Sequence, residues 1–138
     1  MSPTSENDRA ELMQLNQQTF AAEERRDVEG MGWREFLEGV LDPRFTIRRS
    51  RADVPNQSRD EMIEWIAKST VAARTIREED AVVWRSDTLG VVTCPVEMQR
   101  EGALHRYQNV KVFAKKPGES WRCVYWQVSE SPVAPPTA

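Results

Sequence analysis

Two side chains in the second half of the chain have the chemistry of proton transfer. His105 is the only histidine in the sequence, and imidazole is the one side chain whose ordinary pKa lies near neutrality. Glu97 lies in an apolar run, and a carboxylate directed into an apolar cavity would have a raised pKa suited to a general base. Both also have structural interpretations, because His105 follows a turn and Glu97 could face water or pair with Arg106. The sequence favours the structural interpretations, so catalysis by His105 and Glu97 is a hypothesis.

A second group of side chains combines aromatic bodies with hydrogen-bonding tips. Its members are Trp33, Phe45, Trp65, Tyr107, Asn109, Tyr125 and Gln127. This composition is typical of small-molecule pockets and equally of homodimer interfaces. Asn109 and Gln127 could jointly hold a ligand carbonyl or join contacts between two protomers, and the sequence leaves both open. Trp33 and Trp65, one on each covering helix, could line the mouth of a cavity.

The two cysteines predict neither a disulfide nor a metal centre. Cys94 and Cys123 fall in the second and fourth of four predicted strands. If these strands pair in sequence, one strand separates the cysteines and their backbones lie about 9–10 Å apart. A disulfide needs Cα atoms within about 7 Å, so both thiols should stay reduced. One histidine and two separated cysteines also lack the spacing of metal ligands, and no cofactor is expected.

The elements that position these residues are helices in the first half and strands in the second. Capping boxes and apolar spacing predict helices beginning at Asp8 and at Ser58, the second ending near Ser69. A short helix from Trp33 to about Leu41 lies between them and stops at Asp42-Pro43. Residues 45–49 then alternate as a short strand.

Four long β-runs fill the rest of the chain, at about 75–84, 88–100, 104–115 and 120–130. Tight turns containing Asp87, Gly102 and Gly118 join them. Pro95 cannot donate a ladder hydrogen bond, which predicts a bulge there or a missing donor at a sheet edge. A helical first half covering a curved sheet predicts an α+β cone: an antiparallel or mixed sheet covered by about three helices.

The two faces of the sheet are each half apolar, so the sequence does not assign them cleanly. On the third run, one face carries Leu104, Arg106, Gln108, Val110 and Val112, and the other His105, Tyr107, Asn109, Lys111 and Phe113. We expect the valine face to pack under the helices. The mixed face, with Tyr125 and Gln127, would then line a pocket at its inner end or form a homodimer interface.

Charge and composition exclude two partner classes. The net charge is −3, with basic and acidic residues interspersed, so the basic surface needed for nucleic acid is missing. No apolar run reaches the ~18–20 residues of a membrane span, and the N-terminus has no secretory signal pattern, so we expect a cytoplasmic protein. The chain should form one domain over residues 8–130, with disordered ends at 1–7 and 131–138.

Two segments resemble the nuclear-transport-factor-2-like (NTF2-like) superfamily. They are Leu41-Asp42-Pro43-Arg44-Phe45 before the first strand, and a closing pattern of Val110-Lys111-Val112-Phe113, Gly118 and Trp121 to Ser129. The resemblance covers about residues 9–130 and is closest to the SnoaL-like and ketosteroid-isomerase-like branch. It implies an α+β cone with a pocket between sheet and helices, and frequent homodimers. It implies no single reaction.

The residues of this chain argue against assigning it the activity of a specific enzyme of that superfamily. A ketosteroid isomerase would need a tyrosine on the first helix, but Tyr107 and Tyr125 lie on late strands. We therefore expect a domain that binds a small apolar or aromatic molecule. The alternatives are a cofactor-independent isomerase, cyclase or dehydratase, and a protein-interaction module.

Overall fold

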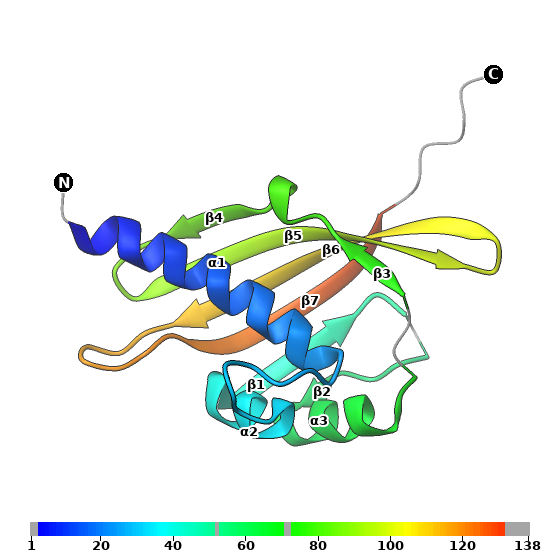
Figure 1. Cartoon of the computed structure of the whole chain (residues 1–138), viewed down its shortest axis with the longest axis horizontal. Helices are drawn as coiled ribbons and strands as arrows, with labels where there is room; N and C mark the ends of the chain where they lie inside the picture. The colour runs from blue at the N-terminus through cyan, green and yellow to red at the C-terminus, as the bar shows by residue number, and fades with distance from the viewer. Residues whose placement is uncertain (1–2, 52, 71–72, 132–138) are drawn as a thin grey trace.

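The computed structural model describes residues 3–51, 53–70 and 73–131. The elements are α1 (Pro3–Glu23), α2 (Trp33–Val40), β1 (Leu41–Arg49), β2 (Gln57–Ser58), α3 (Arg59–Lys68), β3 (Arg74–Ile76), a 3₁₀ turn η1 (Glu78–Asp80), β4 (Val82–Arg85), β5 (Leu89–Arg100), β6 (Ala103–Ala114) and β7 (Arg122–Ser131). The strands form one mixed sheet in the order β2-β1-β7-β6-β5-β3, with β4 also paired to β5. Only the β1–β7 pair is parallel within this part of the chain. The predicted α+β cone is confirmed (Figure 1).

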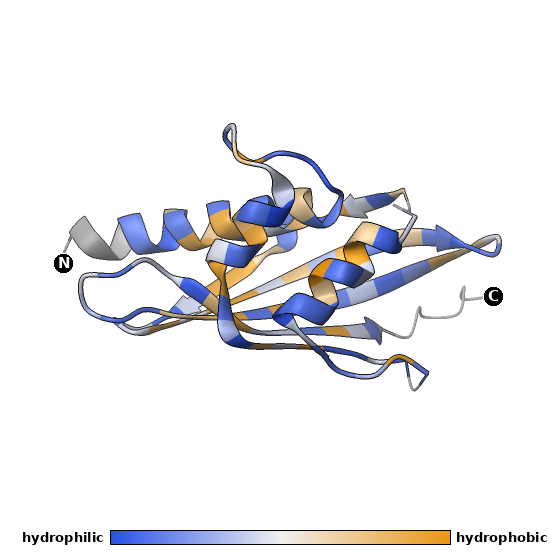
Figure 2. Ribbon diagram, turned by 90° about the horizontal axis from the view of Figure 1, so that it is seen from below, coloured by the Kyte–Doolittle hydropathy of each residue, from blue (hydrophilic) through white to orange (hydrophobic). Residues whose placement is uncertain are grey.

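All three helices lie on one side of the sheet (Figure 2). α1 packs across β4 and β5, and α3 packs on β1. The core between the two layers contains Phe20 of α1, Leu37 of α2, Met62 of α3 and Trp126 of β7, all at most 1% exposed. Across the described ranges, no helix combines the length and apolar character needed to span a bilayer.

The face of the sheet toward the helices, here the inner face, is the opposite of the one expected. On β6 the buried residues are Tyr107, Asn109, Lys111 and Phe113, whereas Val110 and Val112 are only partly buried on the outer face. The prediction that the valines pack under the helices is therefore wrong. The reason is that α1 supplies three oxygen contacts to the Lys111 amine, which allows this polar group to be buried.

A β-bulge divides the faces of β7. Phe113 pairs with Cys123 but Val112 pairs with Tyr125, so one extra residue, Val124, interrupts the alternation. Such an insertion moves every later side chain to the other face. Trp126 consequently points inward, and the aromatic ring of Tyr125 is on the outer face.

The first predicted long strand, residues 75–84, is broken into β3, η1 and β4. β3 pairs with β5 only as far as Val96, and β4 resumes the pairing at Thr93. Between them the Pro95 carbonyl accepts a hydrogen bond from the Arg77 backbone N–H at 2.9 Å. The N–H that Pro95 lacks would face the same side, so the ladder cannot continue there. The N–H that Pro95 lacks therefore faces the gap between β3 and β4, where β5 has no ladder partner. This agrees with the prediction of a missing donor at a sheet edge.

The first helix begins at Pro3 rather than at Asp8. Asp8 lies inside the helix, is 8% exposed, and its Oδ1 lies 3.5 Å from Lys115 Nζ. The predicted cap at Asp8 is therefore wrong, and residues 3–7, expected to be disordered, are helical. Ser131 is the last residue of β7, and the expected disorder of residues 1–2 and 132–138 lies outside the described residues.

Candidate functional site

A cleft of about 310 Å³ opens between α3, the end of α1 and the inner face of the sheet. We call it the α3 cleft. Its walls are Glu23, Arg49, Ser50, Arg51, Val54, Trp65, Ser69, Thr70, Arg74, Val96, Met98, Arg100, Tyr107, Asn109 and Val128. An adjoining hollow of about 190 Å³ shares Arg49, Trp65 and Arg74 with it. The volume lies at the lower end of the range of small-molecule sites.

One wall of the cleft is apolar and is dominated by Trp65. This α3 side chain is 41% exposed, although its neighbours Met62, Ile63 and Ile66 turn into the core. Helix α3 is held in place by a capping box, in which Ser58 accepts from the Glu61 backbone N–H and Glu61 accepts from that of Ser58. The indole therefore stands on a fixed helix and offers a face to a bound molecule.

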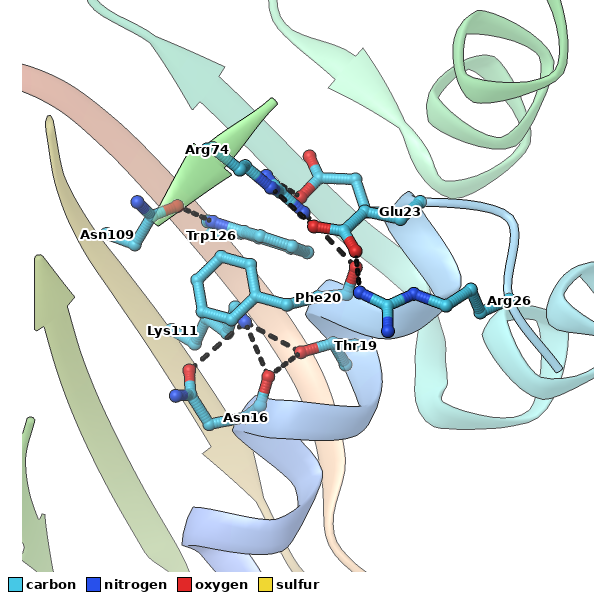
Figure 3. A network of polar contacts seen from close by, with 10 residues as sticks. Asn16, Thr19, Phe20, Glu23, Arg26, Arg74, Asn109, Lys111 and Trp126 are labelled. Carbon is cyan, nitrogen blue, oxygen red and sulfur yellow. Dashed lines mark hydrogen bonds and ion pairs between the residues drawn. The ribbon is translucent and has the colours of Figure 1, made fainter. Parts of the chain in front are cut away.

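Arg74 ties the end of α1 to β3 at the edge of the cleft (Figure 3). Its guanidinium makes ion pairs with Glu23 at 2.8 Å and Glu24 at 2.9 Å, and donates to the Phe20 carbonyl at 3.1 Å. Burial pulls the pKa of Arg74 down, but the two carboxylates more than offset this and the pKa is raised. The positive charge of Arg74 is therefore compensated within the protein.

Arg49 also lies in the cleft, but its contacts are to a neutral amide and an aromatic ring rather than to carboxylates. Its guanidinium donates to the Gln57 side-chain oxygen at 2.5 Å and lies 5.2 Å from the centre of the Trp65 ring. No carboxylate in the described part of the chain lies within ion-pair distance. Burial lowers the pKa of Arg49, and the charge of Glu23 only partly opposes this. Arginine nevertheless stays protonated.

The floor of the cleft presents hydrogen-bond donors. Arg100 donates to the Tyr107 hydroxyl oxygen at 2.7 Å, which leaves the Tyr107 O–H to donate elsewhere. Asn109 accepts from the Trp126 indole N–H at 2.8 Å, so its oxygen is engaged and its NH₂ group is the part available for a ligand. The orientation of that amide follows from the Trp126 hydrogen bond.

Beneath this floor, Lys111 holds α1 against β6 (Figure 3). Its amine contacts the carbonyl and side-chain oxygens of Asn16 and the hydroxyl of Thr19, at 3.2, 3.1 and 2.6 Å. It also lies 3.4 Å from the Phe20 ring centre and 4.1 Å from that of Trp126. Burial lowers the pKa of Lys111 to about 7. The side chain is fully buried, so its function is to position the helix.

Three of the seven predicted ligand-binding residues lie in the α3 cleft: Trp65, Tyr107 and Asn109. Trp33 packs against the hydrophobic core beside Arg34. Phe45 is 1% exposed in the core. The structure thus brings part of the predicted set together, and the binding role of these residues stays a prediction.

Tyr125 and Gln127 lie away from the cleft, on the outer face of the sheet. The bulge after Cys123 places them there, and the Tyr125 hydroxyl donates to the Gln127 side-chain oxygen at 2.7 Å. Gln127 and Asn109 therefore face opposite sides and cannot hold one carbonyl together.

The two candidate catalytic residues are also on opposite faces. Val96 and Met98 of β5 line the cleft, so Glu97 between them faces outward, where it pairs with Arg77 at 3.2 Å. His105 lies beside Tyr107, with 6.4 Å between the ring centres, and its Nδ1 lies 3.2 Å from a Glu130 carboxylate oxygen. Neither residue lines the cleft, and they cannot act together on one molecule inside it.

Neither metal nor thiol chemistry has support in the described ranges. No three His, Cys, Asp or Glu side chains there gather as metal ligands would. Cys94 and Cys123 are free and buried, as expected. Burial raises the pKa of both thiols, that of Cys123 to about 12, which makes them poor nucleophiles.

The arginines are the site residues that sequence reasoning missed. Arg48, Arg49 and Arg51 lie close together beside a strand, a pattern more typical of a solvated strand edge. The signal was nevertheless present, because Arg49 has the same alternation as the apolar residues Phe45 and Ile47, and that alternation places it on the inner face. Arg100 has the same signal, because it continues the alternation of Val96 and Met98, whereas Arg74 has none.

Comparison with solved structures agrees with this geometry. An NTF2-like protein of unknown function from Silicibacter pomeroyi superposes with a TM-score of 0.63, at 20% identity over 95% of this chain and 100% of that one. An NTF2-like protein with a cystatin-like fold from Novosphingobium aromaticivorans gives 0.64, at 16% identity over 89% and 81%. The Chlamydomonas reinhardtii CaMKII hub homology domain gives 0.65, at 18% identity over 91% and 99%.

The chain therefore has the NTF2-like fold, as the resemblance implied. No family model matches its sequence, and no curated protein matches it either. At these identities the likeness concerns the fold alone, so function must be argued from the site.

Proposed function

We propose that the α3 cleft binds a small organic molecule with an aromatic or apolar part, and that the domain acts through binding. The observation that carries this proposal is the cleft itself, which the exposed Trp65 indole lines together with the apolar side chains of Val96, Met98 and Val128. An exposed tryptophan on a rigid helix beside concave apolar surface is characteristic of small-molecule sites.

Tryptophan fluorescence tests this function. Titration with a library of small aromatic compounds should change the emission of the native protein, because Trp65 loses contact with water on binding. Trp65→Phe should abolish most of the change. Trp84→Phe is the control, since Trp84 is also exposed, at 58% against 41% for Trp65, but lies on β4 away from the cleft. Absence of any response across the library would instead favour the interaction-module alternative.

The enzymatic alternative has less support from this geometry. An isomerase, cyclase or dehydratase would need Glu97 or His105 at the reacting atoms, and neither lines the α3 cleft. If turnover of an enolisable ketone is found, His105→Ala should lower it at least tenfold. An unchanged rate would remove His105 from the reaction.

We also propose that a second copy of the chain covers the outer face of the sheet. Trp84 and Val82 of β4 and Leu104 of β6 are 58%, 61% and 44% exposed. The partly buried Val91, Val110 and Val112 share this outer face. Apolar side chains that recur on one face of neighbouring strands are suited to an isologous twofold contact.

A further inference from the structure

The charges around the α3 cleft do not balance. Arg51 is neutralised by Asp53, with contacts of 2.9 and 3.3 Å. Arg74 is neutralised by Glu23 and Glu24. Arg49 and Arg100 have no carboxylate within ion-pair distance among the described residues, so neither positive charge on the cleft walls is directly paired, although the charge of Glu23 acts on Arg49.

Of Arg49 and Arg100, Arg49 matters more for the choice of ligand. Much of its surface is buried between Gln57 and Trp65, and one neutral amide oxygen is its only hydrogen-bond acceptor in the described part of the chain. A guanidinium presents five N–H donors and cannot shed its proton. Partial burial of a charge without an ion-pair partner has a cost, and an anion entering the cleft would relieve it.

The neighbouring polar groups are donors as well. The Tyr107 hydroxyl accepts from Arg100 and so has its own proton to give. The Asn109 oxygen is occupied by Trp126, which leaves the NH₂ group. Glu23, the carboxylate in the cleft wall, is engaged by Arg74. A ligand that enters must therefore bring acceptors.

We infer that the molecule bound in the α3 cleft is a carboxylate with an aromatic body, its carboxylate meeting Arg49 and the Tyr107 hydroxyl and its ring lying against Trp65. This rests on the proposed binding function and narrows its ligand class. A planar carboxylate matches the fork of a guanidinium, and its single charge suits a small cleft in which Arg49 is half-buried and lacks an ion-pair partner. The ring then occupies the apolar wall formed by Trp65 and Met98.

A matched pair of probes separates this inference from the proposed function. 2-Naphthoate and 2-acetonaphthone have the same ring system and similar size, but only the first is charged. Isothermal titration of the native protein should give at least tenfold tighter binding of 2-naphthoate. Arg49→Gln should remove most of that preference while changing 2-acetonaphthone binding less than threefold.

Two further variants control the experiment. Arg48→Gln removes a neighbouring arginine that is exposed and does not line the cleft, and should weaken 2-naphthoate binding less than threefold. Tyr107→Phe removes one hydroxyl, should weaken 2-naphthoate selectively, and carries the test if Arg49→Gln does not fold. Equal binding of both probes would overturn the carboxylate inference and leave the binding function standing. Binding of neither probe would overturn both.

Discussion

At the scale of single residues, Lys111 is a charge-bearing side chain placed wholly inside the core. Removal from water lowers its pKa to about 7, an effect that the charge of Glu23 partly opposes. Three oxygen contacts and two aromatic faces stabilise the ammonium form. The balance between burial and these contacts makes the stability of the fold depend on pH.

The sign of that dependence follows from the two end states. In the unfolded chain a lysine keeps its proton up to about pH 10.4, whereas folded Lys111 releases it near pH 7. Between these values the unfolded state binds the extra proton, so the free energy of unfolding rises with pH, by at most about 1.4 kcal/mol per unit. Lys111→Met should lack this contribution.

Urea denaturation at pH 7, 8 and 9 measures it. The difference in unfolding free energy between the native protein and Lys111→Met should shift in favour of the native protein as pH rises. Lys116→Met, which removes an exposed lysine in the β6–β7 turn, serves as the control. Parallel pH profiles for the native protein and Lys111→Met would contradict the prediction.

Residue positions were predictable from sequence only where strand alternation was unbroken. Tyr107 and Asn109 follow the regular alternation of β6, and both line the α3 cleft. Tyr125 and Gln127 were placed on the same face, but the bulge at Val124 reverses them, and nothing in the local sequence marks that bulge. The sequence also did not predict that Arg49 lacks an ion pair, because ion pairing depends on which carboxylates the fold brings near.

At the scale of elements, α1 and β5 approach each other unusually closely at Gly90. A Cβ atom added there would lie 2.6 Å from Leu12 Cδ1 and 3.0 Å from Leu12 Cδ2. Leu12 is fully buried, so its side chain has little room to move away. Gly90 therefore sets the distance between the first helix and the sheet.

Gly90→Ala should destabilise the protein by about 1–3 kcal/mol through overpacking. Leu12→Ala alone should cost about 2–5 kcal/mol because it leaves a cavity. The double variant should lose less than the sum, since the new methyl group enters the space that Leu12 vacates. Denaturation of all four proteins measures the coupling, and strict additivity would show that the two residues do not meet.

Arg25, which follows α1, joins the end of α1 to the end of α3. This residue has a positive φ of 60° and donates from Nη1 to the carbonyls of Ile66, Ala67 and Ser69 at 3.2, 3.3 and 2.8 Å. A cation at a helix C-terminus satisfies carbonyls that have no helical partner and interacts favourably with the helix dipole. Arg25 thus fixes the end of α3, the helix that carries Trp65.

Arg25→Met should lower the unfolding free energy by about 1 kcal/mol and reduce the fluorescence change of Trp65 on ligand binding. Arg26→Met is a close control, because Arg26 is exposed and pairs only with nearby Glu24 in the described ranges; such a pair contributes about 0–1 kcal/mol. Thermal unfolding and the titration described above measure both effects. Equal behaviour of the two variants would contradict the assigned role of Arg25.

Local chemistry predicted α2 and α3, but it misplaced the start of α1, where Asp8 does not cap the helix. The capping box of Ser58 and Glu61 and the stop at Asp42-Pro43 depend on neighbouring residues, and α3 and α2 formed as expected. The break between β3 and β4 depends on Pro95, which belongs to a later strand, β5. Sequence reasoning identified the missing donor but could not say which neighbouring strand would be interrupted.

At the scale of the whole molecule, the helices and the α3 cleft occupy one side of the sheet and leave the other side uncovered. On that outer face Trp84, Val82 and Leu104 remain exposed. Burying such side chains contributes about 25 cal/mol for each Å² of apolar surface removed from water. A second copy of the same sheet presents a matching surface, and the cleft on the far side stays open in such an assembly.

Light scattering at micromolar concentration should therefore give the mass of a dimer, twice the 15.9 kDa of one chain. Trp84→Glu places a charge within the proposed contact and should shift the protein to a monomer, because a buried charge without a partner is costly. Met31→Glu alters a comparably exposed residue, at 40%, between α1 and α2, and should leave the dimer intact.

Binding of 2-naphthoate should survive in the Trp84→Glu monomer, since no residue of the α3 cleft lies on the outer face. A monomeric native protein would remove the dimer proposal without touching the cleft, whereas loss of binding on dissociation would show that the partner completes the site.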